Sequence, residues 1–195
     1  MRSTLFCICL FAVIFSGCQP AAPPVAVSNT PVSINDRPAA TNNLPLSTSK
    51  PMGEMSWTDS KDRVQKVSDL KGKAVILDFW ATFCEPCRRE IPHLNSLIAK
   101  HGNSGLEVLG LNVGGEEDLV EIPKFVKQTK LDYPIVFPEV ELTAWVFAER
   151  DDIPQTIVLD REGKIVDRFV GFGPQVQRDL DAAVEKALAS GQPAS

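Results

Sequence analysis

The chain has 195 residues, of which 44% are apolar and 23% are charged, and its formal net charge is −5 at pH 7. A chain of this length can bury the core of one domain and still carry appendages. Its sequence has no cluster of basic residues, which excludes the positively charged surface that nucleic-acid binding requires. We therefore expect no nucleic acid among its partners.

Residues 1–17 indicate a targeting segment rather than part of a fold. They begin with a positive charge, and the apolar run at 5–15 is too short to cross a membrane as a stable helix. Residues 15–18 resemble a bacterial lipobox in which Phe15 stands where leucine is usual. This resemblance implies a lipoprotein signal peptide at 1–17 and a lipid anchor on Cys18. The alternatives are an ordinary secretory signal or an uncleaved anchor, and every version places the rest of the chain outside the cytoplasm.

Residues 18–52 predict a flexible linker. Seven prolines fall there among alanine, serine, threonine and asparagine, with few large apolar residues. Such a composition cannot bury enough surface to order itself. A flexible chain of this length reaches on the order of 30 Å, so we hypothesise a tether that lets the domain search for partners near the membrane. Limited proteolysis that spared this segment as well as the domain would contradict the hypothesis.

Residues 53–192 alternate between the apolar periods of strands and helices. In chain order we expect a hairpin over 57–67, a helical turn at 68–70, a strand at 74–80, a helix at 86–100, a strand at 106–113, a segment at 116–130 broken so that its main helix starts at Pro123, a strand at 134–137, a helix at 139–148, a hairpin of 156–160 with 165–170, and an amphipathic helix over 176–188. This order predicts one α/β domain with a three-layer sandwich.

The positions of the five cysteines favour redox chemistry over structural cross-linking. Cys7 and Cys9 would leave with the signal peptide and Cys18 would carry the lipid. This leaves Cys84 and Cys87 with no other thiol to pair with. A disulfide that closes so small a loop constrains little of the unfolded chain, so it would stabilise the fold weakly.

The segment Cys84-Glu85-Pro86-Cys87 lies between the expected strand and the expected helix. Free N–H groups and the positive end of the helix dipole stabilise a thiolate at a helix N-terminus, and Pro86 suits the first helical turn. We therefore expect Cys84 to face outward as the attacking thiol and Cys87 to resolve the mixed disulfide. Glu85 should make the pair a reductant by disfavouring the thiolate, although two arginines that follow act in the opposite direction.

A metal half-site is the alternative use of the two cysteines. The available partners are His93 and His101, which lie about 9 Å and 21 Å beyond Cys87 along a continuous helix. They cannot converge with both cysteines on one ion, so we expect no metal and treat both histidines as helix-surface residues.

Two acidic residues are candidates for proton transfer at the cysteine pair. Asp78 lies within an otherwise apolar strand, where burial would favour its protonated form and let it exchange a proton with Cys87. Alternatively, Asp78 faces solvent at the end of the strand. Glu90 follows Cys87 by three residues and therefore lies on the same face of the helix. It either tunes the reactivity of the two cysteines or faces solvent, paired with a neighbouring arginine. Either acid could be the proton shuttle.

Residues 78–92 and 153–156, with 70–73 and 163–164, resemble the thioredoxin superfamily and its envelope-anchored TlpA/ResA-like branch. The resemblance covers about residues 53–190. It implies a thioredoxin-like sandwich with a central mixed sheet, the insertion typical of this branch within 114–148, a redox-active disulfide between the two cysteines, and no organic cofactor.

The resemblance also implies the residues that meet a substrate. Pro154 should be a cis proline that faces the disulfide, and the backbone of Ile153 should pair with an extended substrate segment. Phe83 stands where the family usually has tryptophan and Gln155 where it usually has threonine, both on the expected substrate face. Trp80 is expected to pack in the core.

These features predict a lipid-anchored, extracytoplasmic thiol–disulfide oxidoreductase that reduces disulfides of exported proteins. By resemblance, apocytochrome c before haem attachment is the leading substrate, and a membrane-embedded thiol protein would supply electrons. The alternatives are a disulfide oxidase or isomerase, a peroxiredoxin-like peroxidase, and a non-catalytic lipoprotein binding module. The peroxidase motif is poorly matched, since only Thr82 stands near Cys84. A copper chaperone would need a histidine in the C-terminal part of the domain, which the sequence lacks.

Overall fold

The computed structural model describes residues 50–191. The predicted signal peptide, Cys18 and nearly all of the predicted linker lie outside these residues. Across 50–191, none of the helices combines the length and the apolar character needed to cross a membrane.

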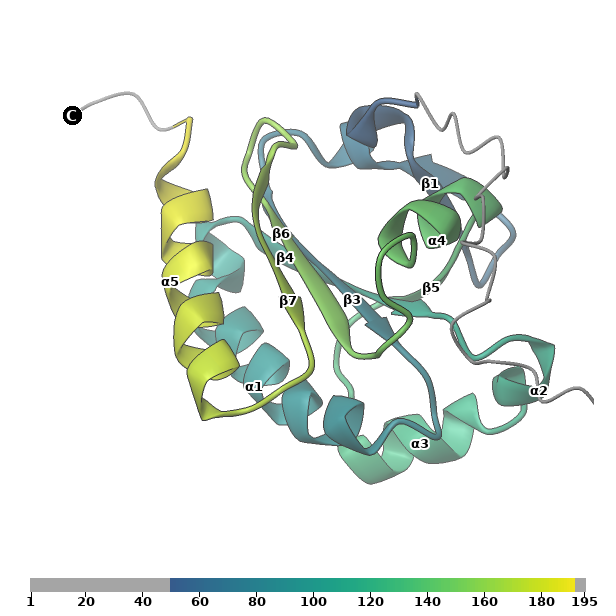
Figure 1. Cartoon of the computed structure of the whole chain (residues 1–195). Helices are drawn as coiled ribbons and strands as arrows, with labels where there is room; N and C mark the ends of the chain where they lie inside the picture. Colours follow the sequence, from purple (N-terminus) through teal and green to yellow (C-terminus); the bar gives the residue numbers. More distant parts are fainter. Residues whose placement is uncertain (1–49, 192–195) are drawn as a thin grey trace, which may run out of the picture. The chain divides into compact units, whose positions relative to one another are not determined.

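Strands and helices alternate along the described chain, as the sequence predicts (Figure 1). After a short 3-10 turn at Met52–Glu54, the elements are β1 (Ser56–Asp59), β2 (Val64–Lys66), a 3-10 turn (Val67–Leu70), β3 (Ala74–Trp80), α1 (Glu85–His101), a 3-10 turn (Gly102–Ser104), β4 (Leu106–Asn112), α2 (Glu116–Leu119), α3 (Ile122–Thr129), β5 (Ile135–Pro138), α4 (Val140–Val146), β6 (Gln155–Leu159), β7 (Ile165–Val170) and α5 (Pro174–Ala189). Both predicted hairpins and the predicted break before α3 are confirmed. The break coincides with Pro123, which lacks an N–H and lies in the first turn of α3, where that N–H would have no partner within the helix.

One seven-stranded sheet organises the domain, with the order β2-β1-β5-β4-β3-β6-β7. The central strand β3 runs parallel to β4 and antiparallel to β6. The sheet is therefore mixed, as expected, and β3 delivers the chain directly from the sheet centre to the start of α1.

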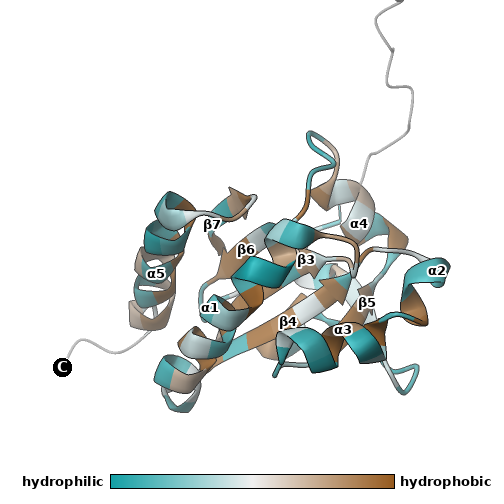
Figure 2. Cartoon of the chain, turned by 90° about the horizontal axis from the view of Figure 1, so that it is seen from below, coloured by the Kyte–Doolittle hydropathy of each residue, from teal (hydrophilic) through white to brown (hydrophobic). Residues whose placement is uncertain are grey.

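The two faces of β3 belong to different layers because successive side chains of a strand point in opposite directions. Ala74, Ile76 and Trp80 pack in the core that α1, α3 and α5 cover. The intervening residues 75, 77 and 79 pack in a second core, which α4 covers. Figure 2 shows the apolar strands enclosed between helices whose outer faces are polar. The fold is the predicted three-layer α/β sandwich.

Candidate active site

The two cysteines of the motif meet at the N-terminus of α1. Cys84 and Cys87 form a disulfide, with their Cα atoms 5.3 Å apart. Cys84 is the N-cap residue of α1, and its Sγ accepts a hydrogen bond from the Cys87 N–H at 3.2 Å. Pro86 occupies the first turn of the helix. The strand-to-helix junction thus places the sulfurs where free N–H groups favour a thiolate.

The expectation that Cys84 faces outward is wrong for this disulfide state. Cys84 is only 5% exposed, whereas the preceding residue, Phe83, is 74% exposed. The side chain of Cys84 turns inward because its sulfur is bonded to Cys87 and accepts the N–H of that residue. The outer surface of the junction is therefore presented by Phe83.

Asp78 is buried beneath this junction, so the alternative of a solvated strand end is wrong. It lies between Ile76 and Trp80 on β3 and so faces the same layer as the cysteines. The Tyr133 hydroxyl donates a hydrogen bond of 2.9 Å to Oδ2, while Oδ1 has no hydrogen-bond partner among the described residues. Burial raises the pKa of Asp78 to about 7, against the lowering effect of the tyrosine hydrogen bond. This acid can therefore exchange a proton near neutral pH.

Glu90 is a second buried acid in the same layer, and its solvent-facing alternative is wrong as well. The Thr156 hydroxyl donates to Glu90 Oε1 at 2.7 Å, and Oε2 has no partner among residues 50–191. Thr156 lies directly opposite Asp78 across the β3–β6 pair, which brings the two acids to the same place. Burial, followed by the charge of Asp78, raises the pKa of Glu90 well above its usual value.

Arg88 does not pair with Glu90. Its guanidinium donates to the Thr82 carbonyl at 2.9 Å and lies over the ring of Phe125, 4.5 Å from the centroid. Trp80 stacks on the same phenylalanine, with ring centroids 4.6 Å apart, and is fully buried. The prediction that Trp80 packs in the core is confirmed.

The peptide bond between Ile153 and Pro154 is cis, as predicted. The expectation that Gln155 lies on the substrate face is wrong, because its side chain is fully buried. Its amide Nε2 donates to the carbonyl oxygens of Arg150 and Asp152, at 2.9 Å and 3.0 Å. Gln155 therefore fixes the loop that precedes the cis proline instead of meeting a substrate.

Two of the predicted substrate residues line one surface pocket. A pocket of about 300 Å³ is lined by Phe83, Val113, Thr143, Phe147, Asp151 and Ile153. The residue before the attacking cysteine and the residue before the cis proline thus share a mostly apolar depression, into which an apolar side chain can fit.

Sequence reasoning missed Asp118, which holds the loop before the cysteines. Asp118 is buried in α2 and accepts hydrogen bonds from the Thr82 N–H, at 3.1 Å and 3.2 Å to its two oxygens, and from the Thr82 hydroxyl. The Asn112 amide donates to the same carboxylate at 2.7 Å. Thr82 lies 36 residues before Asp118 in the sequence. Asp118 also follows two other acidic residues, so nothing in the sequence indicated that it, unlike its neighbours, would be buried.

Replacing Asp118 by alanine is expected to lower the free energy of unfolding by about 2 kcal/mol, because buried donors of Thr82 and Asn112 lose their charged acceptor. Urea unfolding of the disulfide form measures the change. Glu117→Ala is the matched control, since Glu117 is an exposed acid on the same helix. A loss no larger than that of the control would contradict the assignment.

The two histidines of α1 are not surface residues, which corrects the expectation. His101 is buried, and His93 has little exposed side chain because α5 packs beside α1 (Figure 1). Nε2 of His93 lies 3.0 Å from an oxygen of Asp181, and Nε2 of His101 lies 3.4 Å from one of Glu185. Within 50–191, no group of three or more histidine, cysteine or acidic side chains could hold a metal ion.

The AhpC/TSA family model matches residues 48–168, which is more than half of the chain. The chain belongs to the AhpC/TSA family. Among curated relatives of this family domain, thiol-disulfide oxidoreductase ResA of Bacillus cereus is 30% identical over 129 residues, or 66% of this chain and 72% of the relative. ResA of Geobacillus thermodenitrificans is 33% identical over 128 residues, or 66% of this chain and 71% of the relative.

Solved structures place this AhpC/TSA domain in the same fold. A thiol:disulfide interchange protein of the thioredoxin family from Chlorobium tepidum is 27% identical, with a TM-score of 0.58 over 72% of this chain and 98% of that one. The protein is thus a thioredoxin-like thiol–disulfide oxidoreductase of the ResA type.

Proposed function

We propose that this oxidoreductase works as a reductant of disulfides in exported proteins, with apocytochrome c before haem attachment as the leading substrate. The observation that carries the proposal is the disulfide at the start of α1 above two buried acids, Asp78 and Glu90. The pair stores two electrons as a dithiol, and the acids supply a site for the proton of the resolving thiol. The reaction therefore needs no organic cofactor.

The proposed reaction begins with the dithiol. The Cys84 thiolate attacks one sulfur of the substrate disulfide, and the other substrate sulfur leaves as a thiolate that takes a proton from solvent. The Cys87 thiol then gives its proton to a buried carboxylate and attacks Cys84 Sγ. The disulfide of the enzyme forms as the mixed disulfide breaks, and the second substrate sulfur leaves. Two electrons pass to the substrate, so a thiol protein must reduce the enzyme again.

The cis proline and the pocket support a binding mode for the substrate. An extended segment would pair with the backbone of Ile153 as an added strand does. A side chain beside the substrate cysteine would enter the pocket that Phe83 and Ile153 share. The lipid on Cys18 would hold the enzyme at the outer side of a membrane, where exported substrates and a membrane-embedded electron donor both occur.

The experiment uses the reduced protein with a synthetic peptide that carries an intramolecular Cys-x-x-Cys disulfide. We expect stoichiometric reduction of the peptide and a reduction potential on the order of that of thioredoxin, about −270 mV. A potential near that of strong disulfide donors, about −120 mV, would favour the oxidase or isomerase alternative. Faster oxidation of the enzyme by hydrogen peroxide than by the peptide would favour the peroxidase.

A further inference from the structure

Gly110 creates an opening in the sheet beside Asp78. It lies directly opposite Asp78 across the parallel pair β3–β4. A Cβ atom at Gly110 would lie 2.8 Å from Nε1 of Trp80 and 3.0 Å from the Tyr133 ring, which is closer than side-chain contacts normally allow. The missing side chain is therefore what lets the tyrosine ring cross β4 toward β3.

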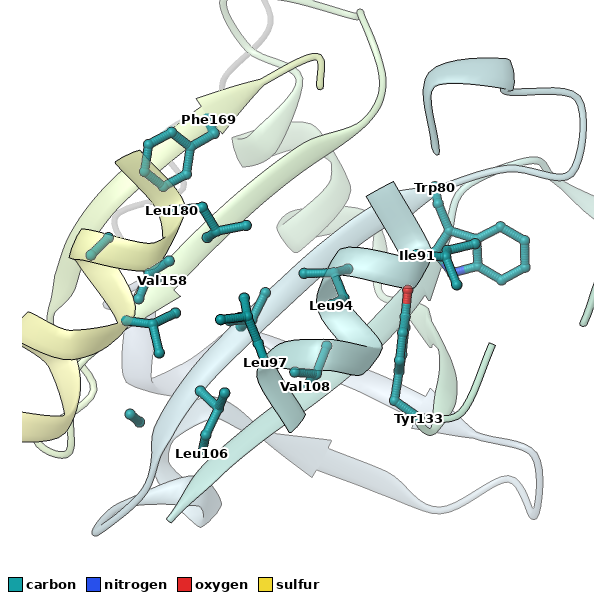
Figure 3. Close-up of a cluster of buried hydrophobic side chains, with 14 of the residues drawn as sticks. Trp80, Ile91, Leu94, Leu97, Leu106, Val108, Tyr133, Val158, Phe169 and Leu180 are labelled. Atoms are coloured by element: carbon teal, nitrogen blue, oxygen red, sulfur yellow. The ribbon is translucent and has the colours of Figure 1, made fainter. Parts of the chain in front are cut away.

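Tyr133 uses this opening to reach the buried acid. It precedes β5, and its hydroxyl points toward the end of the core where Ile91 and Trp80 lie (Figure 3). The hydroxyl donates to Asp78 Oδ2 at 2.9 Å, and both side chains are buried. The other oxygen of Asp78 has no hydrogen-bond partner among the described residues. One oxygen is thus held while the second stays free.

We propose that Tyr133 is a positioning residue for the resolving step: it fixes Oδ2 of Asp78 and leaves Oδ1 to take the proton of Cys87. The inference rests on the proposed function and deepens it. As the Cys87 sulfur attacks Cys84 Sγ, its proton passes to Asp78, the new disulfide forms, and the substrate sulfur leaves with the electron pair of the broken bond. No further reactant is required.

The burial of Asp78 explains why a donating hydroxyl is needed here. The titratable groups that interact with Asp78 are Glu90 of α1 and Tyr133. The disulfide-bonded cysteines at the start of α1 pack in the same layer of the core. Burial opposes a charged Asp78, whereas the hydrogen bond donated by Tyr133 stabilises its carboxylate. The same surroundings raise the pKa of Tyr133 well above its usual value, first through burial and then through the charge of Asp78, so the hydroxyl remains a donor.

The test is Tyr133→Phe, which keeps the ring and removes the hydroxyl. We measure the resolving step as the rate at which the peptide is released from Cys84, and we expect this rate to fall about fivefold at pH 7, which corresponds to one lost hydrogen bond. The pH profile of the release rate should move to higher pH, because the hydrogen bond no longer lowers the pKa of Asp78. The control is Thr129→Val, which removes a hydroxyl that donates to the Phe125 carbonyl of its own helix. An unchanged profile, or an equal change in the control, would overturn the proposal.

A double-mutant cycle separates positioning from packing. In an Asp78→Asn background, Tyr133→Phe should produce no further shift of the pH profile, because its effect passes through Asp78. A shift of the same size in both backgrounds would show that Tyr133 acts otherwise, and the proposal would fail.

Tyrosine absorbance gives a readout that does not depend on activity. Tyr133 is the only tyrosine of the chain, so absorbance at alkaline pH reports this hydroxyl alone. We expect it to titrate above the usual tyrosine pKa in the wild type and closer to it in Asp78→Asn; the same titration in both would contradict the hydrogen bond. If the hydroxyl behaves as expected while the wild type fails to reduce the peptide, the proposed function has failed and the contact stands.

Discussion

Replacing Cys84 by serine is expected to abolish disulfide reduction, lowering its rate by a factor on the order of 10³ or more, as loss of a catalytic nucleophile does. A serine hydroxyl is not ionised near neutral pH and cannot form the mixed disulfide. Replacing Cys87 by serine should have a different consequence. The Cys84 thiolate still attacks, but nothing resolves the adduct, so the mixed disulfide accumulates on Cys84.

The two variants are compared by mass spectrometry and by peptide reduction under the same conditions. Serine is a favourable N-cap residue, so Cys84→Ser should retain α1, and its circular dichroism checks this. Identifying the proteins that become bound to Cys87→Ser in the cell envelope would name the substrates. If Cys84→Ser kept the full biological activity, the protein would be a binding module and the proposed catalytic role would be wrong.

Replacing Asp78 by asparagine is expected to stabilise the disulfide form at alkaline pH while impairing the chemistry. The folded protein holds the Asp78 pKa at about 7, raised from 3.8 by burial. Unfolding therefore releases a proton between about pH 4 and pH 7, so this residue makes the fold less stable as the pH rises through that range. At pH 8 the variant should be more stable by on the order of 4 kcal/mol, since one pKa unit corresponds to about 1.4 kcal/mol and the pKa is raised from 3.8 to about 7.

Urea unfolding at pH 3 and pH 8 measures this difference, and it should be small at pH 3, where the acid is mostly protonated in both the folded and the unfolded state. The resolving step should slow about 10²-fold with loss of an acid–base group. Asp167→Asn is the matched control, because Asp167 is an exposed acid on β7. A variant that is no more stable than the wild type at pH 8 would contradict the raised pKa.

The sequence alone determined the elements that depend on local pattern. The apolar run of β3 and the helical period of α1 placed Cys84 and Cys87 at a strand-to-helix junction, and the position of Pro123 separated α2 from α3. These features arise from neighbours within a few residues, where backbone geometry and side-chain periodicity act directly. The same reasoning singled out Asp78 and Glu90 but left their burial undecided.

Only the tertiary structure decided which side chains share a buried space. Tyr133 reaches Asp78 across 55 residues of sequence and Asp118 reaches Thr82 across 36. Gln155 and His101 are buried because other segments cover them. A buried polar group must find its partner wherever the packed chain supplies one. The order of the strands and the packing of the helices determine which partner each buried polar group meets. The pattern of neighbouring residues in the sequence does not contain this information.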